Sequence, residues 1–198
     1  MATKPIGTGT RMSVAEFLDL PDTEERNKME LDDGELYIMP RPRREYQSTL
    51  FWLIWHLADY IRGFAEPPAE AYPDLVVVLS QNPRRVLVPD LAIILADRSD
   101  IFRDGYAEGI PDIVVEILST DRSRDLIRKR QLYADAGVAE YWIFDPVNDT
   151  ALLLELRDGE YATRGLLTTN DILTTPLLPG LAIPLAELFH HRQRPADV

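Results

Sequence analysis

The chain of 198 residues contains no cysteine and only three histidines. Without cysteine neither a disulfide framework nor a thiolate metal site can form, and a reducing compartment is the natural setting. The histidines, at positions 56, 190 and 191, lack the spacing of metal ligands. The sequence therefore predicts a cytoplasmic protein without structural zinc.

Long apolar runs are also missing. Residues 1–13 lack the apolar core of a signal peptide, and the longest apolar runs are far shorter than a membrane-spanning stretch. We expect no membrane partner. Apolar residues make up 45% of the chain and charged residues 27%, as in a packed globular protein. The expected organisation is one domain over 1–198, with 1–12 as a flexible tail.

Basic residues are fewer than acidic ones, 21 against 33, so the net charge is −12. A general nucleic-acid coat depends on neutralising phosphates and is therefore disfavoured. Arginine and lysine do gather at 41–44, 84–85 and 122–130. A solvated face is the simpler interpretation of each cluster alone, so any contact with DNA must be local.

The apolar pattern predicts an α/β fold. Ser13 and Glu16 have the spacing of a capping box, which predicts a short helix to about Leu20. The other predicted elements are a hairpin over 29–38, a helix over 47–62, strands at 75–80, 86–95 and 110–118, a helix over 121–136, a strand at 140–144, a hairpin over 151–167 and a short helix at 185–189. The middle strands are almost continuously apolar, which indicates a mixed or parallel sheet covered by helices on both faces.

Two carboxylates interrupt these core strands. Asp90 lies in the strand 86–95 and Glu116 in the strand 110–118, and a lone buried carboxylate is costly. Lys129 shares one stripe of the following helix with Tyr133, so it is a plausible partner. From the residues alone, a structural ion pair and a catalytic site are equally favoured.

The catalytic interpretation is a metal-assisted hydrolysis of phosphodiesters. Carboxylates on two adjacent strands supply the oxygen ligands that Mg²⁺ prefers. A neighbouring lysine can position or deprotonate the attacking water and offset charge that develops on the phosphorus. The metal lowers the pKa of its bound water and polarises the phosphate.

Four motifs carry a resemblance to a known family. They are Val88-Pro89-Asp90, the run 111–119 (PDIVVEILS), the run 129–133 (KRQLY) and the run 137–142 (GVAEYW). Together they resemble the Uma-type restriction endonuclease family of the PD-(D/E)XK nuclease superfamily, over most of the chain. The resemblance implies a restriction-endonuclease-like core, with a mixed central sheet flanked by helices, an N-terminal hairpin and a C-terminal β extension.

The resemblance also implies an activity and a set of site residues. The activity is hydrolysis of DNA that depends on Mg²⁺, with Mn²⁺ as a possible substitute. Asp90 and Glu116 would be metal ligands, and the backbone carbonyl of Ile117 a further one. The lysine expected two residues after the acid is replaced by Leu118, and Lys129 matches the place to which relatives move it.

Two further positions follow from the same resemblance. Glu30 matches an acidic position in the N-terminal hairpin, where it assists the metal or pairs with a base. Many members of the family carry a histidine before the first long helix, and Tyr46 stands at that place here.

Three functions are weighed on these grounds. The first is a metal-dependent DNA endonuclease, expected to be a homodimer because cutting two strands calls for two sites. The second is a catalytically inactive nuclease-fold module for binding or interaction, in which the acid–lysine cluster is structural. The third and weaker one uses Asp90 and Glu116 as an acid–base pair on another substrate such as a sugar. Nucleophile-elbow, phosphate-loop and dinucleotide fingerprints are absent from the sequence.

Overall fold

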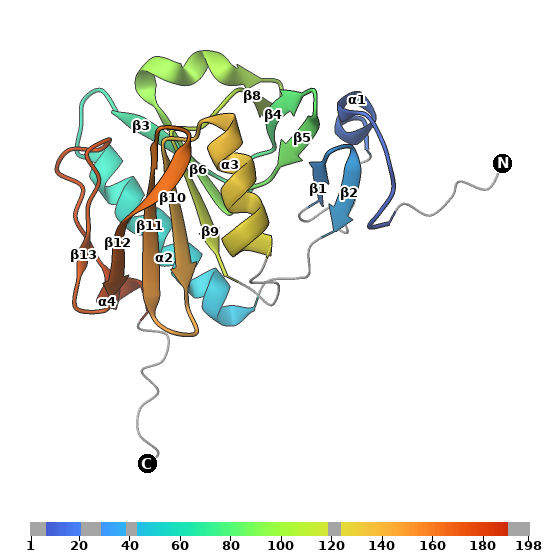
Figure 1. Ribbon diagram of the computed structural model, residues 1–198. Coiled ribbons are helices and arrows are strands. Elements are labelled where there is room, and N and C mark those ends of the chain that lie inside the picture. Colours follow the sequence, from blue (N-terminus) through green and yellow to red (C-terminus); the bar gives the residue numbers. More distant parts are fainter. Residues whose placement is uncertain (1–6, 21–28, 39–42, 119–123, 190–198) are drawn as a thin grey trace.

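The computed structural model describes residues 7–20, 29–38, 43–118 and 124–189 (Figure 1). This part of the chain is mixed α/β, with two six-stranded sheets and few helices, as the sequence predicts. Its helical segments are α1 (Val14–Leu18), α2 (Arg44–Arg62), the 3₁₀ helix η2 (Ala96–Ile101), the π-helix η3 (Arg124–Lys129), α3 (Arg130–Ala136) and α4 (Leu185–Leu188).

The first sheet has the strand order β2-β1-β5-β4-β8-β7. Its strands are β1 (Met29–Asp32), β2 (Glu35–Ile38), β4 (Val77–Gln81), β5 (Arg84–Leu87), β7 (Phe102–Arg103) and β8 (Tyr106–Glu108). The β1–β2 hairpin confirms the predicted turn, because Asp33 and Gly34 take the positive φ angles, 49° and 76°, that a tight hairpin turn requires.

The second sheet has the order β12-β11-β10-β9-β6-β3. Its strands are β3 (Ala69–Pro73), β6 (Leu91–Leu95), β9 (Ile113–Ile117), β10 (Glu140–Asp145), β11 (Thr150–Arg157) and β12 (Glu160–Thr168). Within this sheet β9 and β10 pair in parallel and the other neighbours pair antiparallel; the connection from β9 to β10 carries η3 and α3. A separate short pair, β13 (Ile172–Leu173) and β14 (Ile183–Pro184), precedes α4.

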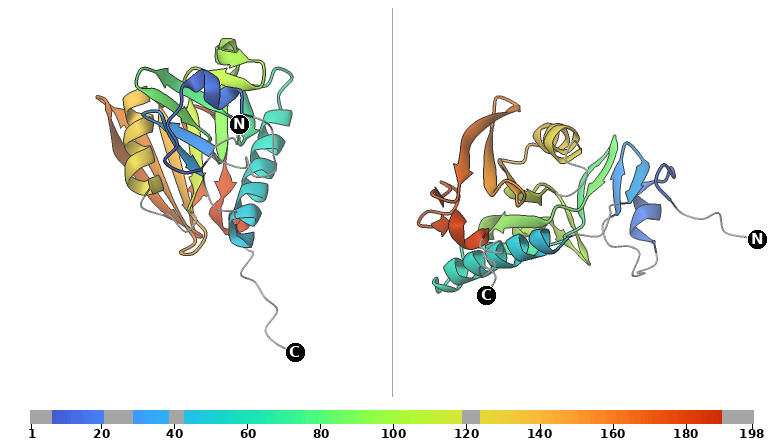
Figure 2. Two further views of the ribbon diagram at one scale, coloured as in Figure 1. Left: turned by 90° about the vertical axis from the view of Figure 1, so that its right-hand side faces the viewer. Right: turned by 90° about the horizontal axis from the view of Figure 1, so that it is seen from below.

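Helix α2 covers one face of the second sheet, and α3 covers the opposite face (Figure 2). Val115 and its neighbours two residues away on β9 pack in one core with Leu53 and Leu57 of α2. Val114 packs in another core with Leu132 of α3. Strand alternation therefore directs Glu116, two residues after Val114, toward α3.

The predicted strand 86–95 is wrong in one respect, since it forms two strands in different sheets. β5 ends at Leu87 in the first sheet, and β6 begins at Leu91 in the second. Pro89 has no N–H for a sheet ladder, so it is unsuited to the middle of a strand. Sequence reasoning also missed β3, which pairs with β6 at the edge of the second sheet.

The structure confirms two predicted helix ends. Ser13 and Glu16 form the reciprocal hydrogen bonds of a capping box. Gly137 ends α3 in the left-handed conformation, with φ of 92°. Of the segment 1–12, expected to be a flexible tail, residues 1–6 lie outside the described residues, and residues 7–12 are hydrogen-bonded to the β1–β2 hairpin. Residues 121–123 of the predicted helix also lie outside them.

Candidate active site

The predicted site residues meet where the chain passes from the first sheet to the second. Residues 88–90 connect β5 to β6, and Asp90 directly precedes Leu91. Leu91 pairs with Val115, so Asp90 and Glu116 are the next residues along these two antiparallel strands. The Asp90 carboxylate lies against the end of β9, where its Oδ2 accepts a hydrogen bond of 2.6 Å from the backbone N–H of Ile117.

Glu116 receives two donors from the helical connection. Lys129 Nζ and the Tyr133 hydroxyl both lie 2.9 Å from Glu116 Oε1 and donate to it. A spacing of four residues places these two side chains on one helix face, as the sequence predicts. Only about 3% of each side chain is exposed for Glu116 and Lys129, so this ion pair is buried.

Glu30 adds a third carboxylate from the first sheet. It lies on β1, is fully buried, and its Oε1 is 2.9 Å from Lys129 Nζ. The same oxygen accepts from the backbone N–H of Val88 at 3.3 Å. Glu30 thus pairs with a base in this structure, and Lys129 bridges the two sheets through Glu30 and Glu116.

A π-helix carries Lys129 into the site. Lys129 is the last residue of η3, and α3 begins at Arg130. π-helical turns are rare and frequently occur at functional sites. Before Lys129, Arg128 makes a two-point contact with Asp32 of β1, with both N–O distances 2.6 Å. This contact ties the hairpin that carries Glu30 to the helix that carries Lys129.

Tyr46, which stands at the family's histidine position, contacts Asp90. It is the third residue of α2 and is 6% exposed, and its phenol is hydrogen-bonded to the Asp90 side chain. Burial raises the pKa of Tyr46 strongly, and the charge of Asp90 raises it further. Burial likewise raises the pKa of Tyr133, together with the charge of Glu116. Both phenols are therefore hydrogen-bond donors.

The candidate site is a cluster of buried charged side chains. Glu30, Asp90 and Glu116 are buried carboxylates, and Lys129 is the one buried lysine or arginine among the residues that the structure describes. Burying ionised groups is expensive unless they are paired and hydrogen-bonded, and the contacts of Lys129 with Glu30 and Glu116 meet this requirement for three of the four side chains.

The small set of oxygen donors suits Mg²⁺, which does not need a closed cage of protein ligands. Within the described ranges, no group of three or more histidine, cysteine, aspartate or glutamate side chains is arranged to hold a metal ion. Mg²⁺ is usually bound through one or two carboxylates, with waters and substrate phosphates completing its octahedron. Asp90, Glu116 and the carbonyl of Ile117 form a set of that size.

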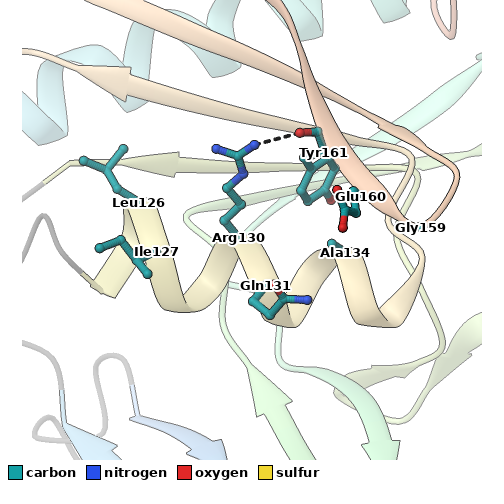
Figure 3. A pocket seen from close by; sticks show the side chains of 8 residues that line it. All are labelled: Leu126, Ile127, Arg130, Gln131, Ala134, Gly159, Glu160 and Tyr161. Carbon is teal, nitrogen blue, oxygen red and sulfur yellow. Dashed lines mark hydrogen bonds between the residues drawn. The ribbon is translucent and has the colours of Figure 1, made fainter.

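A pocket of about 400 Å³ lies against another face of the same helical connection (Figure 3). It is lined by Leu126, Ile127, Arg130, Gln131, Ala134, Gly159, Glu160 and Tyr161. Arg130 spans it and donates to the backbone carbonyl of Tyr161 at 2.7 Å. None of the acid–lysine residues lines this pocket, so it is separate from the candidate active site.

Comparisons with known proteins agree with the fold. A crystal structure of a protein from Anabaena variabilis, described as a putative nuclease belonging to DUF820, is similar with a TM-score of 0.72. The two chains are 20% identical, and the similarity covers 90% of this chain and 98% of the other. The curated proteins give no significant match.

None of the helices in the described part of the chain is long and apolar enough to cross a membrane.

The sequence also matches a family model. The family model named Uma2, described as "Putative restriction endonuclease", matches residues 14–186. This range includes β1, the β5–β6 junction, β9 and the helix with Lys129. The chain therefore belongs to the Uma2 family.

Proposed function

We propose that this protein is an endonuclease that hydrolyses DNA phosphodiester bonds and requires Mg²⁺ or Mn²⁺. The observation that carries the proposal is that Asp90 and Glu116 lie side by side and buried at the junction of the two sheets, with the Lys129 ammonium 2.9 Å from Glu116. In the proposed site Asp90, Glu116 and the backbone carbonyl of Ile117 hold the metal ion. Family membership supports the nuclease chemistry.

When bound, the metal supplies a Lewis acid for the phosphate and a water of lowered pKa. The protein supplies the arrangement around it. The N–H of Ile117 orients the Asp90 carboxylate through the 2.6 Å hydrogen bond. The Tyr133 hydroxyl fixes Glu116 through Oε1, so both candidate ligands are oriented before the substrate binds.

Lys129 has the electrostatic role in the proposed reaction. Its ammonium lies beside Glu116, where it can donate a hydrogen bond to the attacking water or to a phosphate oxygen and offset charge developing on the phosphorus. Glu30 holds Lys129 from the other side at 2.9 Å and restricts its rotamers. Glu30 is in this way a positioning residue and not a metal ligand.

The partner in this proposal is DNA, although the net charge of −12 opposes a broad phosphate contact. A local contact with cations near the site is sufficient. Arg43 and Arg44 at the start of α2 are exposed, and this helix also carries Tyr46, which contacts Asp90. Cutting both strands of a duplex calls for two sites, so the proposal includes a homodimer.

The test is DNA cleavage with matched variants. Purified protein is incubated with supercoiled, linear and single-stranded DNA in the presence of Mg²⁺, Mn²⁺ or EDTA. We expect metal-dependent cleavage of at least one substrate, loss of cleavage in Asp90→Asn and Glu116→Gln, and retention in Glu140→Gln, which replaces another buried glutamate of the same sheet. Intact DNA with every metal, or equal cleavage by the wild type and Asp90→Asn, would falsify the proposal.

A second candidate is a metal-free interaction module of the same fold. It is favoured by the direct pairing of Lys129 with two carboxylates, which is also how a structural cluster would look. In that case the melting temperature would not rise on addition of Mg²⁺, and Glu116→Gln would lower stability because it weakens a buried pair.

A further inference from the structure

We infer that Tyr46 and Tyr133 are a matched pair of positioning residues, each of which holds one of the two proposed metal-ligand carboxylates through its phenol hydroxyl. The inference rests on the proposed function and deepens it. It assigns a role to two residues on separate helices, one on each face of the second sheet.

The first half of the pair is Tyr133 on α3. Its hydroxyl donates to Glu116 Oε1 at 2.9 Å, and the ring is fully buried. Its ring centroid lies 5.2 Å from that of Tyr141, so packing fixes the direction of the hydroxyl. Lys129 donates to the same oxygen. Both donors act on Oε1 and thereby fix the orientation of the other oxygen, Oε2.

The second half is Tyr46 on α2, which reaches the cluster from the opposite face. Tyr46 packs in the core with Ile117 and Leu91, the residues that flank the site on β9 and β6. Its phenol is hydrogen-bonded to Asp90, whose Oδ2 also accepts from the N–H of Ile117. Asp90 is therefore held by the backbone of β9 and by a side chain of α2.

A phenol is suited to this role because it donates a hydrogen bond without adding a positive charge. A lysine or arginine at either place would add a positive charge to that of Lys129 and weaken the attraction of the carboxylates for a metal ion. Hydrogen bonds of this kind to ligating carboxylates fix their orientation, and their removal commonly costs 10–100-fold in metal affinity. The two tyrosines therefore orient the carboxylates without adding positive charge to the site.

The test compares three Tyr→Phe substitutions by calorimetric titration with Mn²⁺ and by thermal unfolding in EDTA. Tyr46→Phe and Tyr133→Phe remove the proposed positioning hydroxyls. Tyr161→Phe is the matched control, because its buried hydroxyl donates to the carbonyl of Val138 at 2.9 Å. We expect Mn²⁺ affinity to fall about 10–100-fold in Tyr46→Phe and in Tyr133→Phe and to stay at the wild-type value in Tyr161→Phe.

A cleavage measurement adds a second readout. In Tyr46→Phe and Tyr133→Phe the rate should fall at low Mn²⁺ and recover at saturating Mn²⁺, which a loss of stability alone would not produce. Wild-type affinity in both variants overturns the assignment of the tyrosines and leaves the proposed function standing. Absence of Mn²⁺ binding by the wild-type protein overturns the proposed function and the inference together. If one variant fails to fold, the other tests the inference from the opposite face.

Discussion

Two buried glutamates on neighbouring strands of the second sheet have different surroundings. Glu116 on β9 shares Lys129 with a second carboxylate, Glu30. Glu140 on β10 is also 2% exposed, but its partners are Trp142 Nε1 at 2.7 Å, Thr175 Oγ1 at 2.7 Å and Arg164 at 3.3 Å. The Glu140 cluster pairs one carboxylate with one guanidinium.

The difference lies in how each carboxylate is paired. Both oxygens of Glu140 accept hydrogen bonds, and Arg164 balances its charge. Glu116 Oε1 accepts from both Lys129 and Tyr133, and Glu30 shares the same ammonium. Burial alone therefore does not distinguish the two glutamates; the groups that surround each of them do.

The largest expected effect comes from Lys129→Met. It leaves Glu30 and Glu116 buried without their shared cation, and breaking a buried pair in this way costs about 3–5 kcal/mol. Urea denaturation measures the loss. The control is Arg130→Met on the next residue, whose partner is a carbonyl. Equal losses in the two variants would mean that Lys129 has no special part in the cluster.

A second prediction concerns metal addition. Mg²⁺ at one hundred times its dissociation constant should raise the free energy of unfolding by about 2.7 kcal/mol, because only the folded state binds it. Glu116→Gln should abolish this gain and Glu140→Gln should keep it. Differential scanning calorimetry with Mg²⁺ and with EDTA makes the comparison. If the free energy of unfolding of Glu116→Gln still rises with Mg²⁺, Glu116 is not a metal ligand.

Without metal, Glu140→Gln should lower the free energy of unfolding more than Glu116→Gln does. In Glu140→Gln an amide N–H₂ replaces one carboxylate oxygen and faces either Trp142 Nε1 or the Thr175 hydroxyl, both of which donate to Glu140. One buried donor is then left without an acceptor, which costs about 1–3 kcal/mol. Glu116→Gln keeps an oxygen for Lys129 and Tyr133, and Lys129 keeps Glu30 as a charged partner, so its cost should be smaller. Chemical denaturation in EDTA gives both values, and a larger cost for Glu116→Gln favours the structural module.

The local elements of this fold could be predicted from the sequence because their signals are local. The turn after Asp32, the apolar stripe of α2 and the C-cap Gly137 all lie within the segments that they shape. The pairing of Glu116 with Lys129 could be proposed because strand alternation and helix spacing each restrict one side chain.

The remaining features depend on residues far apart in the chain. The split of 86–95 into two sheets is decided by pairing partners, since β5 joins β1 and β4 while β6 joins β9 and β3. Glu140 meets Thr175 across 35 residues, and no spacing rule anticipates that contact. The π-helix before α3 and the contact of Tyr46 with Asp90 likewise depend on packing around the site.

The smallest expected effect compares two half-exposed arginines, each paired with a buried aspartate. Arg128 pairs with Asp32 and Arg98 pairs with Asp112, and the two arginine side chains are 45% and 41% exposed. Because water screens both pairs, Arg128→Met and Arg98→Met should each cost no more than about 1 kcal/mol.

The two substitutions should differ at the site. Arg128 ties β1, which carries Glu30, to the helix that carries Lys129. Arg98 ties η2 to the start of β9 and has no contact with the acid–lysine cluster among the bonds it makes. Arg128→Met should therefore weaken Mn²⁺ binding in a calorimetric titration, while Arg98→Met should not. Equal Mn²⁺ affinities would show that the hairpin keeps Glu30 in place without this tie, and that the buried pair with Lys129 is enough.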